Sequence, residues 1–242
     1  MITRFDSLPL LTLVTTRTTR LSVRIVTALI ALWVLTHTAI AQQLTAVDGD
    51  SADAAALLQL LNTPNHVAIM RHTLAPGTGD PMTVELGNCA TQRNLSAEGR
   101  EQARNAGALF KQHGIESAAV YSSQWCRCLD TATLMNLGTV TPLPVINSFF
   151  RDRQNARPQT EALAQWLVTD KPNQPTLLVT HQVNITALTG VYPQSGEVVI
   201  FRLDDPENNN PAKDNTQQNK TDQASDDQLP VITVVGRMVF EI

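Results

Sequence analysis

Residues 66–72 read His-Val-Ala-Ile-Met-Arg-His, and this stretch decides the fold class. Its centre is apolar without alternation, which is typical of a strand buried on both faces. An arginine and a histidine follow directly, where the strand should end. Residues 176–181, Thr-Leu-Leu-Val-Thr-His, form a second such apolar run that is followed by a histidine. Two such strands predict a mostly parallel sheet covered by helices on both faces.

Helical patterns alternate with short strands outward from these two segments. Ser96 suits a helix N-cap, small and apolar residues recur at helical spacing up to Phe110, and Gly114 suits the helix end. Further helices are expected over 54–61, 125–135 and 158–168, and further strands over 118–122, 144–146, 197–203 and 230–242. The alternation predicts an α/β fold, a three-layer α/β/α sandwich with a mostly parallel central sheet, and the last two strands should form a hairpin.

The ends of the expected strands carry side chains that suit a phosphate. Arg71 and His72 follow the first strand, Arg127 lies one helical turn beyond the strand at 118–122, and His181 follows the strand at 176–180. Ligands in such folds bind at the carboxyl ends of the strands. Guanidinium groups match the paired oxygens of a phosphate. A neutral imidazole can attack phosphorus, and a second imidazole, if protonated, would stabilise the transferring oxygens.

Four segments resemble, in order, the motifs of the histidine phosphatase superfamily, which includes phosphoglycerate mutase. They are VAIMRHT at 67–73, RNLSAEG at 93–99, YSSQWCRCLDTA at 121–132 and LLVTH at 177–181. The resemblance implies a phosphoglycerate mutase-like fold and a phosphate-accepting nucleophile at His72, with Arg71, Arg127 and His181 completing the phosphate pocket. Arg93 lies where small bacterial phosphohistidine phosphatases carry an arginine, so it is a candidate substrate ligand; the alternative is a surface arginine beside a helix.

The chain departs from the family pattern at the proton donor. Many relatives place a glutamate after the strand expected at 144–146, where this chain has Asn147, and the acid-phosphatase branch has His-Asp where Gln182 follows the histidine here. Thr73 also replaces the usual glycine. The candidate acids are Asp80, Glu85 and Glu197, and each has the alternative of a turn or surface carboxylate. Without an acid, the enzyme should be slow or prefer good leaving groups.

The three cysteines are expected to form one disulfide. If the motifs share a pocket, Cys89 lies near Cys126 and Cys128 and pairs with one of them. Cys126 and Cys128 point to different sides of a helix and should not pair with each other. A zinc site built from these cysteines and His72 would lack the usual paired Cys-x₂₋₄-Cys ligands. No nucleotide, flavin or metal motif appears, so neither a cofactor nor a metal is expected.

The two ends of the chain differ from its middle. Residues 1–41 are predicted to be a signal peptide, with basic residues, a short apolar run at 25–35 and an Ala-x-Ala site ending at Ala41. An uncleaved anchor is the alternative. Residues 42–242 would form the histidine phosphatase domain. Residues 204–228 hold seven acids, two lysines and many amides, which predicts a disordered insertion or, alternatively, a partner-binding segment.

The overall composition narrows the function classes. Hydrophobic residues make up 43% of the 242 residues, which excludes a fully disordered chain. A net charge of −4 with no basic block argues against a nucleic-acid partner. The prediction is a periplasmic or secreted phosphomonoesterase for a small phosphorylated substrate, such as an envelope sugar phosphate, with no membrane contact after signal cleavage. The alternative is a catalytically inactive phosphate-binding or interaction protein. The sequence does not give the oligomeric state.

Overall fold

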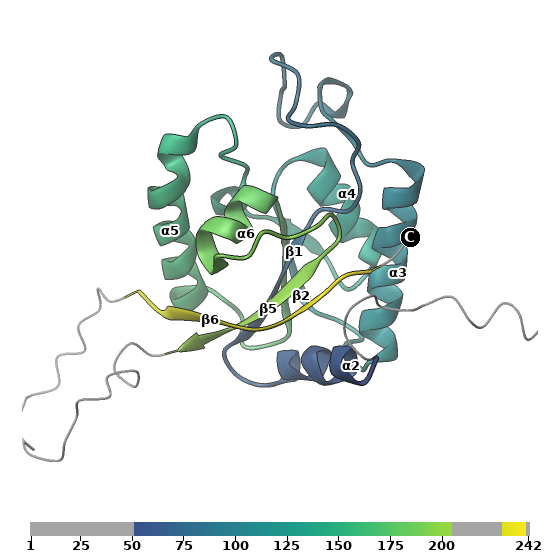
Figure 1. Ribbon diagram of the computed structural model, residues 1–242, viewed down its shortest axis with the longest axis vertical. Coiled ribbons are helices and arrows are strands. Elements are labelled where there is room, and N and C mark those ends of the chain that lie inside the picture. Colours follow the sequence, from purple (N-terminus) through teal and green to yellow (C-terminus); the bar gives the residue numbers. More distant parts are fainter. Residues whose placement is uncertain (1–50, 205–228, 241–242) are drawn as a thin grey trace, which may run out of the picture. The chain divides into compact units, whose positions relative to one another are not determined.

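The computed structural model describes residues 51–204 and 229–240 (Figure 1). The predicted signal peptide and nearly all of the predicted insertion lie outside the described residues. The helices are α2 (Ser51–Gln59), α3 (Ala97–Gln112), α4 (Cys126–Met135), α5 (Ala156–Thr169) and α6 (Gln182–Thr189). The strands are β1 (His66–Arg71), β2 (Ala119–Ser122), β3 (Val140–Pro142), β4 (Thr176–Thr180), β5 (Val198–Asp204) and β6 (Val231–Met238). No helix within these described ranges is long and apolar enough to cross a membrane.

The six strands form one sheet in the order β3-β2-β4-β1-β5-β6. The first four strands of this order pair in parallel, whereas β5 runs antiparallel to both β1 and β6. The predicted α/β fold with a mostly parallel sheet is therefore confirmed. The expected pairing of the last two strands is also present, and it runs from Val198 opposite Met238 to Asp204 opposite Val231.

Helices cover both faces of the sheet (Figure 1). Neighbouring residues of a strand point to opposite faces. Ala68 and Met70 of β1 thus pack in a cluster with Phe110 of α3, together with residues of α2 and α4. Val67 and Ile69 belong to the opposite cluster, with residues of α5 and α6. All four of these strand residues are fully buried, as the unbroken apolar run predicts.

The start of α3 shows why its motif contains a glycine. Ser96 is the N-cap, and its hydroxyl accepts a hydrogen bond from the N–H of Gly99 at 3.0 Å. A Cβ at Gly99 would lie 2.0 Å from the carbonyl oxygen of Leu74, and one at Gly107 equally close to that of Met135. These glycines thus bring α3 against the segment after β1 and against α4.

Two local predictions differ from the structure. Residues Pro144–Ile146 form a 3₁₀ turn instead of a strand, and the edge strand β3 precedes it. Ile146 is fully buried although it belongs to this turn. A buried apolar residue was therefore not evidence for a strand at this position. Helix α6 was not predicted, because its β-branched residues are weak helix formers. Gly190, with φ of 75°, ends it.

Candidate active site

A pocket of about 200 Å³ lies at the carboxyl ends of the parallel strands. All five predicted site residues line it: Arg71, His72, Arg93, Arg127 and His181. The register of the sheet explains how the two histidines meet. Arg71 of β1 pairs with Thr180 of β4, so the next residue of each strand extends into the same space. The two imidazole rings have centroids 5.6 Å apart.

His72 is held as a neutral imidazole with a defined tautomer. Its side chain is buried, and Nδ1 lies 2.8 Å from the carbonyl oxygen of Thr73. A carbonyl only accepts hydrogen bonds, so Nδ1 carries the proton and Nε2 keeps a lone pair. Burial, followed by the positive charge of Arg127, lowers the pKa of His72 well below its ordinary value. His72 is therefore neutral near pH 7, and the lone pair of its Nε2 is not protonated.

His181 has the opposite tautomer. Its Nδ1 lies 3.3 Å from Nη2 of Arg127, and a guanidinium only donates. The proton is therefore on Nε2, which donates to the hydroxyl of Ser123 at 2.8 Å. Burial and the charge of Arg127 lower the pKa of His181 well below its ordinary value. The second imidazole is thus neutral in this arrangement.

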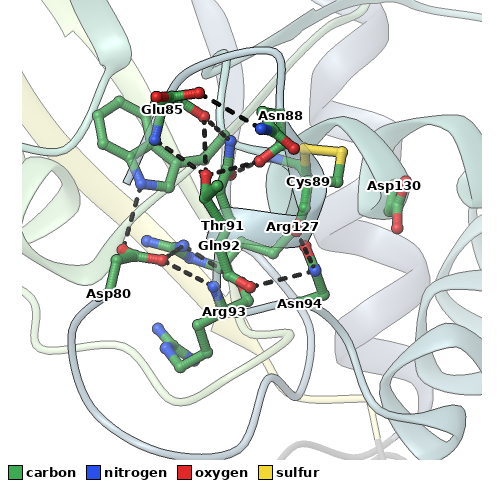
Figure 2. Close-up of a disulfide and its surroundings, with 12 residues drawn as sticks. Asp80, Glu85, Asn88, Cys89, Thr91, Gln92, Arg93, Asn94, Arg127 and Asp130 are labelled. Atoms are coloured by element: carbon green, nitrogen blue, oxygen red, sulfur yellow. Dashed lines mark hydrogen bonds and ion pairs between the residues drawn. A yellow bond between two sulfur atoms is a disulfide. The ribbon is translucent and has the colours of Figure 1, made fainter. Parts of the chain in front are cut away.

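Asp80 is the candidate acid that lines the pocket, and Figure 2 shows its contacts. Its Oδ1 accepts hydrogen bonds from Nη1 of Arg127 at 2.8 Å and from the backbone N–H of Arg93 at 3.0 Å. Its Oδ2 accepts from the indole of Trp125 at 3.2 Å. Burial opposes ionisation of Asp80, but these hydrogen bonds and the charge of Arg127 outweigh it and lower its pKa. Asp80 is consequently a carboxylate in this arrangement.

The other two candidate acids lie outside the pocket lining. Glu85 is exposed and accepts a hydrogen bond from Asn88 at 3.3 Å, within the same loop (Figure 2). Glu197 is buried, and its carboxylate accepts from Nε of Arg237 at 2.5 Å and from the backbone N–H of Gln194 at 2.7 Å. Both carboxylates thus bind neighbouring protein groups and do not face the pocket.

Arg93 supports the loop that carries Asp80. Its Nε donates to the carbonyl of Gly79 at 2.9 Å, and its Nη1 donates to the carbonyl of Ala75. The side chain lines the pocket and is only partly exposed. Arg93 is therefore placed to shape the loop as well as to face a ligand.

Two buried guanidinium N–H groups lack partners. Nε of Arg71 and Nε of Arg127 have no hydrogen-bond acceptor among the described residues. Leaving such a donor unsatisfied costs about 1–3 kcal/mol. Arg127 itself is 3% exposed, and burial of this kind is typical of an arginine that binds a charged group. An anion in the pocket would supply acceptor oxygens.

The positions that carry the acid in relatives have other contacts here. Oδ1 of Asn147 accepts from the hydroxyl of Ser123 at 3.2 Å and from the N–H of Gln124 at 2.8 Å. Asn147 therefore holds the loop after β2. Gln182 lines the pocket, but its amide donates to Thr186 in its own helix at 2.8 Å.

A disulfide joins Cys89 to Cys126 (Figure 2). The predicted bridge is thus present, and of the two alternatives the partner is Cys126. Cys128 is a free, fully buried thiol whose pKa is raised to about 12 by burial. Among the described residues, no group of three or more His, Cys, Asp and Glu side chains is placed to hold a metal ion.

Several residues of the pocket were not found from the sequence. Trp125 packs edge-on against the ring of His181, with centroids 5.5 Å apart. Arg151 and Tyr192 line the mouth and belong to loops that follow β3 and α6. The signal for candidate residues in the sequence is their position directly after a predicted strand. Arg151 and Tyr192 lie in loops that do not directly follow a strand with such residues, so that signal could not find them.

Comparisons with known proteins agree with this description. Residues 84–149 match the model of the histidine phosphatase superfamily, branch 1. This match confirms the resemblance of the motifs to that superfamily over the segment from the loop after β1 to the turn after β3. The matched segment contains Arg93 and Arg127, whereas both pocket histidines lie outside it.

Solved structures with a similar fold include two that are named as phosphatases. A mycobacterial glucosyl-3-phosphoglycerate phosphatase is 16% identical over 57% of this chain and 92% of its own, with a TM-score of 0.42. The putative phosphohistidine phosphatase SixA from Agrobacterium tumefaciens is 15% identical over 59% of this chain and 94% of its own, with a TM-score of 0.41. No curated protein sequence matches this chain.

Proposed function

We propose that this chain is an exported phosphomonoesterase that hydrolyses a small phosphate ester through a phosphohistidine on His72. One observation carries the proposal. Nδ1 of His72 is bound to the Thr73 carbonyl, which leaves the Nε2 lone pair free in a pocket lined by four arginines. A nucleophile of this type and a cationic pocket suit an ester dianion.

The reaction has two steps. In the first, Nε2 of His72 attacks phosphorus, the bond between phosphorus and the ester oxygen breaks, and the alcohol leaves with one proton. In the second, water attacks the phosphohistidine, releases inorganic phosphate and restores the imidazole. Arg71 and Arg127 are the proposed donors to the phosphoryl oxygens, and Arg93 is a further substrate-binding residue. His181 would become a third donor when the bound dianion favours a proton on its Nδ1, which faces Arg127.

Asp80 is the proposed source of the proton. Its contacts with Arg127, Arg93 and Trp125 keep it ionised, but a phosphate dianion bound to the same arginines would repel its charge and raise its pKa. Asp80 would then take up a proton as substrate binds and deliver it to the leaving oxygen. Glu85 and Glu197 are not proposed, since neither lines the pocket.

The alternative function is a catalytically inactive phosphate-binding or interaction protein. It is motivated by Asn147 and Gln182, which replace the two usual acids and instead hold neighbouring groups. The favourable tautomer of His72 supports the enzyme instead.

Export is the second part of the proposal. The signal-peptide pattern of residues 1–41 and the disulfide Cys89–Cys126 support an oxidising compartment, the periplasm or the exterior. Residues 42–242 would be the phosphatase domain after cleavage, without a membrane or nucleic-acid partner. An envelope sugar phosphate is the substrate that this location favours.

The test is hydrolysis of p-nitrophenyl phosphate from pH 4 to 8 by the exported protein and by His72→Ala, with Arg157→Gln as a surface control. We expect the control to match the parent and His72→Ala to lose activity by at least about 10³-fold, because the nucleophile is absent. If neither parent nor variant turns over while phosphate still raises the melting temperature, the binding alternative is correct.

A further inference from the structure

We propose that Arg151 forms a second anion subsite, so that the alcohol part of the substrate carries its own carboxylate or phosphate. The inference rests on the proposed function, because it concerns the leaving group of that reaction. It identifies a class of substrate, an ester with two anionic groups, in place of a neutral sugar phosphate.

The pocket has a buried floor and an exposed mouth. His72, Arg127 and His181 form the floor and are at most 4% exposed. Phe150, 41% exposed, and Tyr192, 71% exposed, belong to the mouth together with the exposed Arg151. Phosphoryl transfer to His72 places the phosphate at the floor. The alcohol must therefore extend toward the mouth, where Arg151 lies.

The charges of the lining favour more than one anionic group. Four arginines and one carboxylate, Asp80, line the pocket, and both histidines are neutral because burial lowers the pKa of each. The lining therefore carries three net positive charges. A monoester dianion at the floor neutralises two of them. One positive charge remains for a second anion while Asp80 is ionised, and two remain once Asp80 has taken up its proton.

Arg151 is the arginine best placed to take it. Arg127 already pairs with Asp80, Arg93 holds two loop carbonyls, and Arg71 donates to the carbonyl of Pro193 at 2.9 Å. Arg151 forms no ion pair with any carboxylate of residues 51–204 and 229–240. Its Nη2 donates to the carbonyl of Asp80, which holds the guanidinium at the pocket.

The chemistry of this group fits carboxylates and phosphates. A guanidinium offers five N–H donors in a planar fork and binds two oxygens at once. One contact to a carbonyl leaves most of these donors available. Arg157 provides the contrast, since it is exposed and already pairs with Glu161 at 2.7 Å.

The contact with the Asp80 carbonyl allows a different role, in which Arg151 only positions the loop. The two roles predict different kinetics. A positioning residue affects every ester to the same extent, because the same loop serves all of them. A subsite residue affects esters with a second anion more strongly.

The experiment compares esters that differ in one group. The first set is glucose 6-phosphate, 6-phosphogluconate and glucose 1,6-bisphosphate, which carry a neutral group, a carboxylate and a phosphate at C1. The second is glycerol 3-phosphate and 3-phosphoglycerate. We measure kcat/KM for phosphate release by the parent, Arg151→Gln and Arg157→Gln, and also the dissociation constant of each ester from its effect on the melting temperature.

We expect the parent to prefer at least one two-anion ester over its neutral counterpart by at least about tenfold, which corresponds to about 1.4 kcal/mol. Arg151→Gln should remove this preference and Arg157→Gln should keep it. A preference restricted to carboxylates or to the bisphosphate identifies the second group. An equal loss for all esters, or no preference in the parent, overturns the proposal.

Turnover of p-nitrophenyl phosphate by the parent separates the two proposals. If the parent hydrolyses it without any preference for a second anion, the subsite fails and the phosphatase stands. If the parent hydrolyses nothing, the proposed function fails, and the dissociation constants decide the subsite alone. In that case, equal binding of two-anion and neutral esters would refute it.

Discussion

Asp80 has the most consequential contacts of any single residue in the pocket. Its carboxylate forms an ion pair with Arg127. In the proposed mechanism, the guanidinium of Arg127 also binds the phosphate of the substrate. Asp80 and substrate thus share a cation, and substrate binding should change the proton affinity of Asp80. This coupling lets one carboxylate be ionised before binding and act as an acid afterwards.

The loss of activity in Asp80→Asn should therefore depend on the leaving group of the substrate. We expect kcat for an alkyl phosphate such as glycerol 3-phosphate to fall about 10²–10⁴-fold, because its alkoxide needs a proton. Hydrolysis of p-nitrophenyl phosphate should fall much less, because p-nitrophenolate leaves without a proton.

Glu85→Gln is the matched control, since it removes a carboxylate from the same loop outside the pocket lining. Its kcat for both substrates should equal that of the parent. Equal losses for both substrates in Asp80→Asn would contradict an acid role and indicate that Asp80 only orders the loop.

The disulfide acts at the scale of elements. Cys89 lies in the loop between β1 and α3, and Cys126 is the first residue of α4, one position before Arg127 (Figure 2). The bridge therefore fixes the loop that carries Asp80 and Arg93 relative to Arg127, which is proposed to bind the phosphate. Hydrogen bonds from Arg93 to Gly79 and from the N–H of Cys126 to Gln92 reinforce this connection.

Removing the bridge should lower stability more than removing the free thiol. The cysteines are 37 residues apart, and closing a loop of this length stabilises the folded chain by about 4 kcal/mol in the chain-entropy model. We expect the double variant Cys89→Ala and Cys126→Ala to lose most of this free energy of unfolding, measured with urea.

Dithiothreitol provides the control for that comparison. It should lower the midpoint of unfolding of the parent and of Cys128→Ala, which keeps the bridge, but leave the double variant unchanged. A parent that is insensitive to the reductant, although mass spectrometry shows both thiols reduced, would show that the bridge contributes little.

At the scale of the whole molecule, burial of two neutral histidines makes stability depend on pH. Burial lowers the pKa of both His72 and His181. In the unfolded chain each would titrate near pH 6.5. Below that pH the unfolded state binds more protons than the folded state, so the free energy of unfolding decreases as the pH falls.

We expect the free energy of unfolding to be nearly constant from pH 8 to 7 and to fall below pH 6.5 by up to about 2.7 kcal/mol per pH unit, since each histidine contributes up to about 1.4. Urea titrations at pH 7.5, 6.5 and 5.5 measure this. His72→Gln should reduce the slope by about half. A flat profile in the parent would contradict the burial of neutral imidazoles. Asp80, whose pKa is lowered, affects stability only at more acidic pH.

The sequence by itself determined the fold class and five residues of the pocket. The fold class and four of these residues follow from local patterns, whereas Arg93 was predicted only from the resemblance to small bacterial phosphohistidine phosphatases. Unbroken apolar runs specify strands buried on two faces, and a polar residue directly after such a strand lies at the carboxyl end of the sheet, where ligands bind. The prediction of Arg71, His72 and His181 needed no knowledge of any loop.

Only the tertiary structure decided which carboxylate joins the pocket, which cysteine pairs with Cys89, and that Arg151 lies at the mouth. Each depends on the path of a loop. The path near Asp80 is set by contacts between distant residues, such as Arg93 with Gly79 and Arg151 with the Asp80 carbonyl. Local patterns do not encode such contacts, because they form only when the sheet has brought separate segments of the chain together.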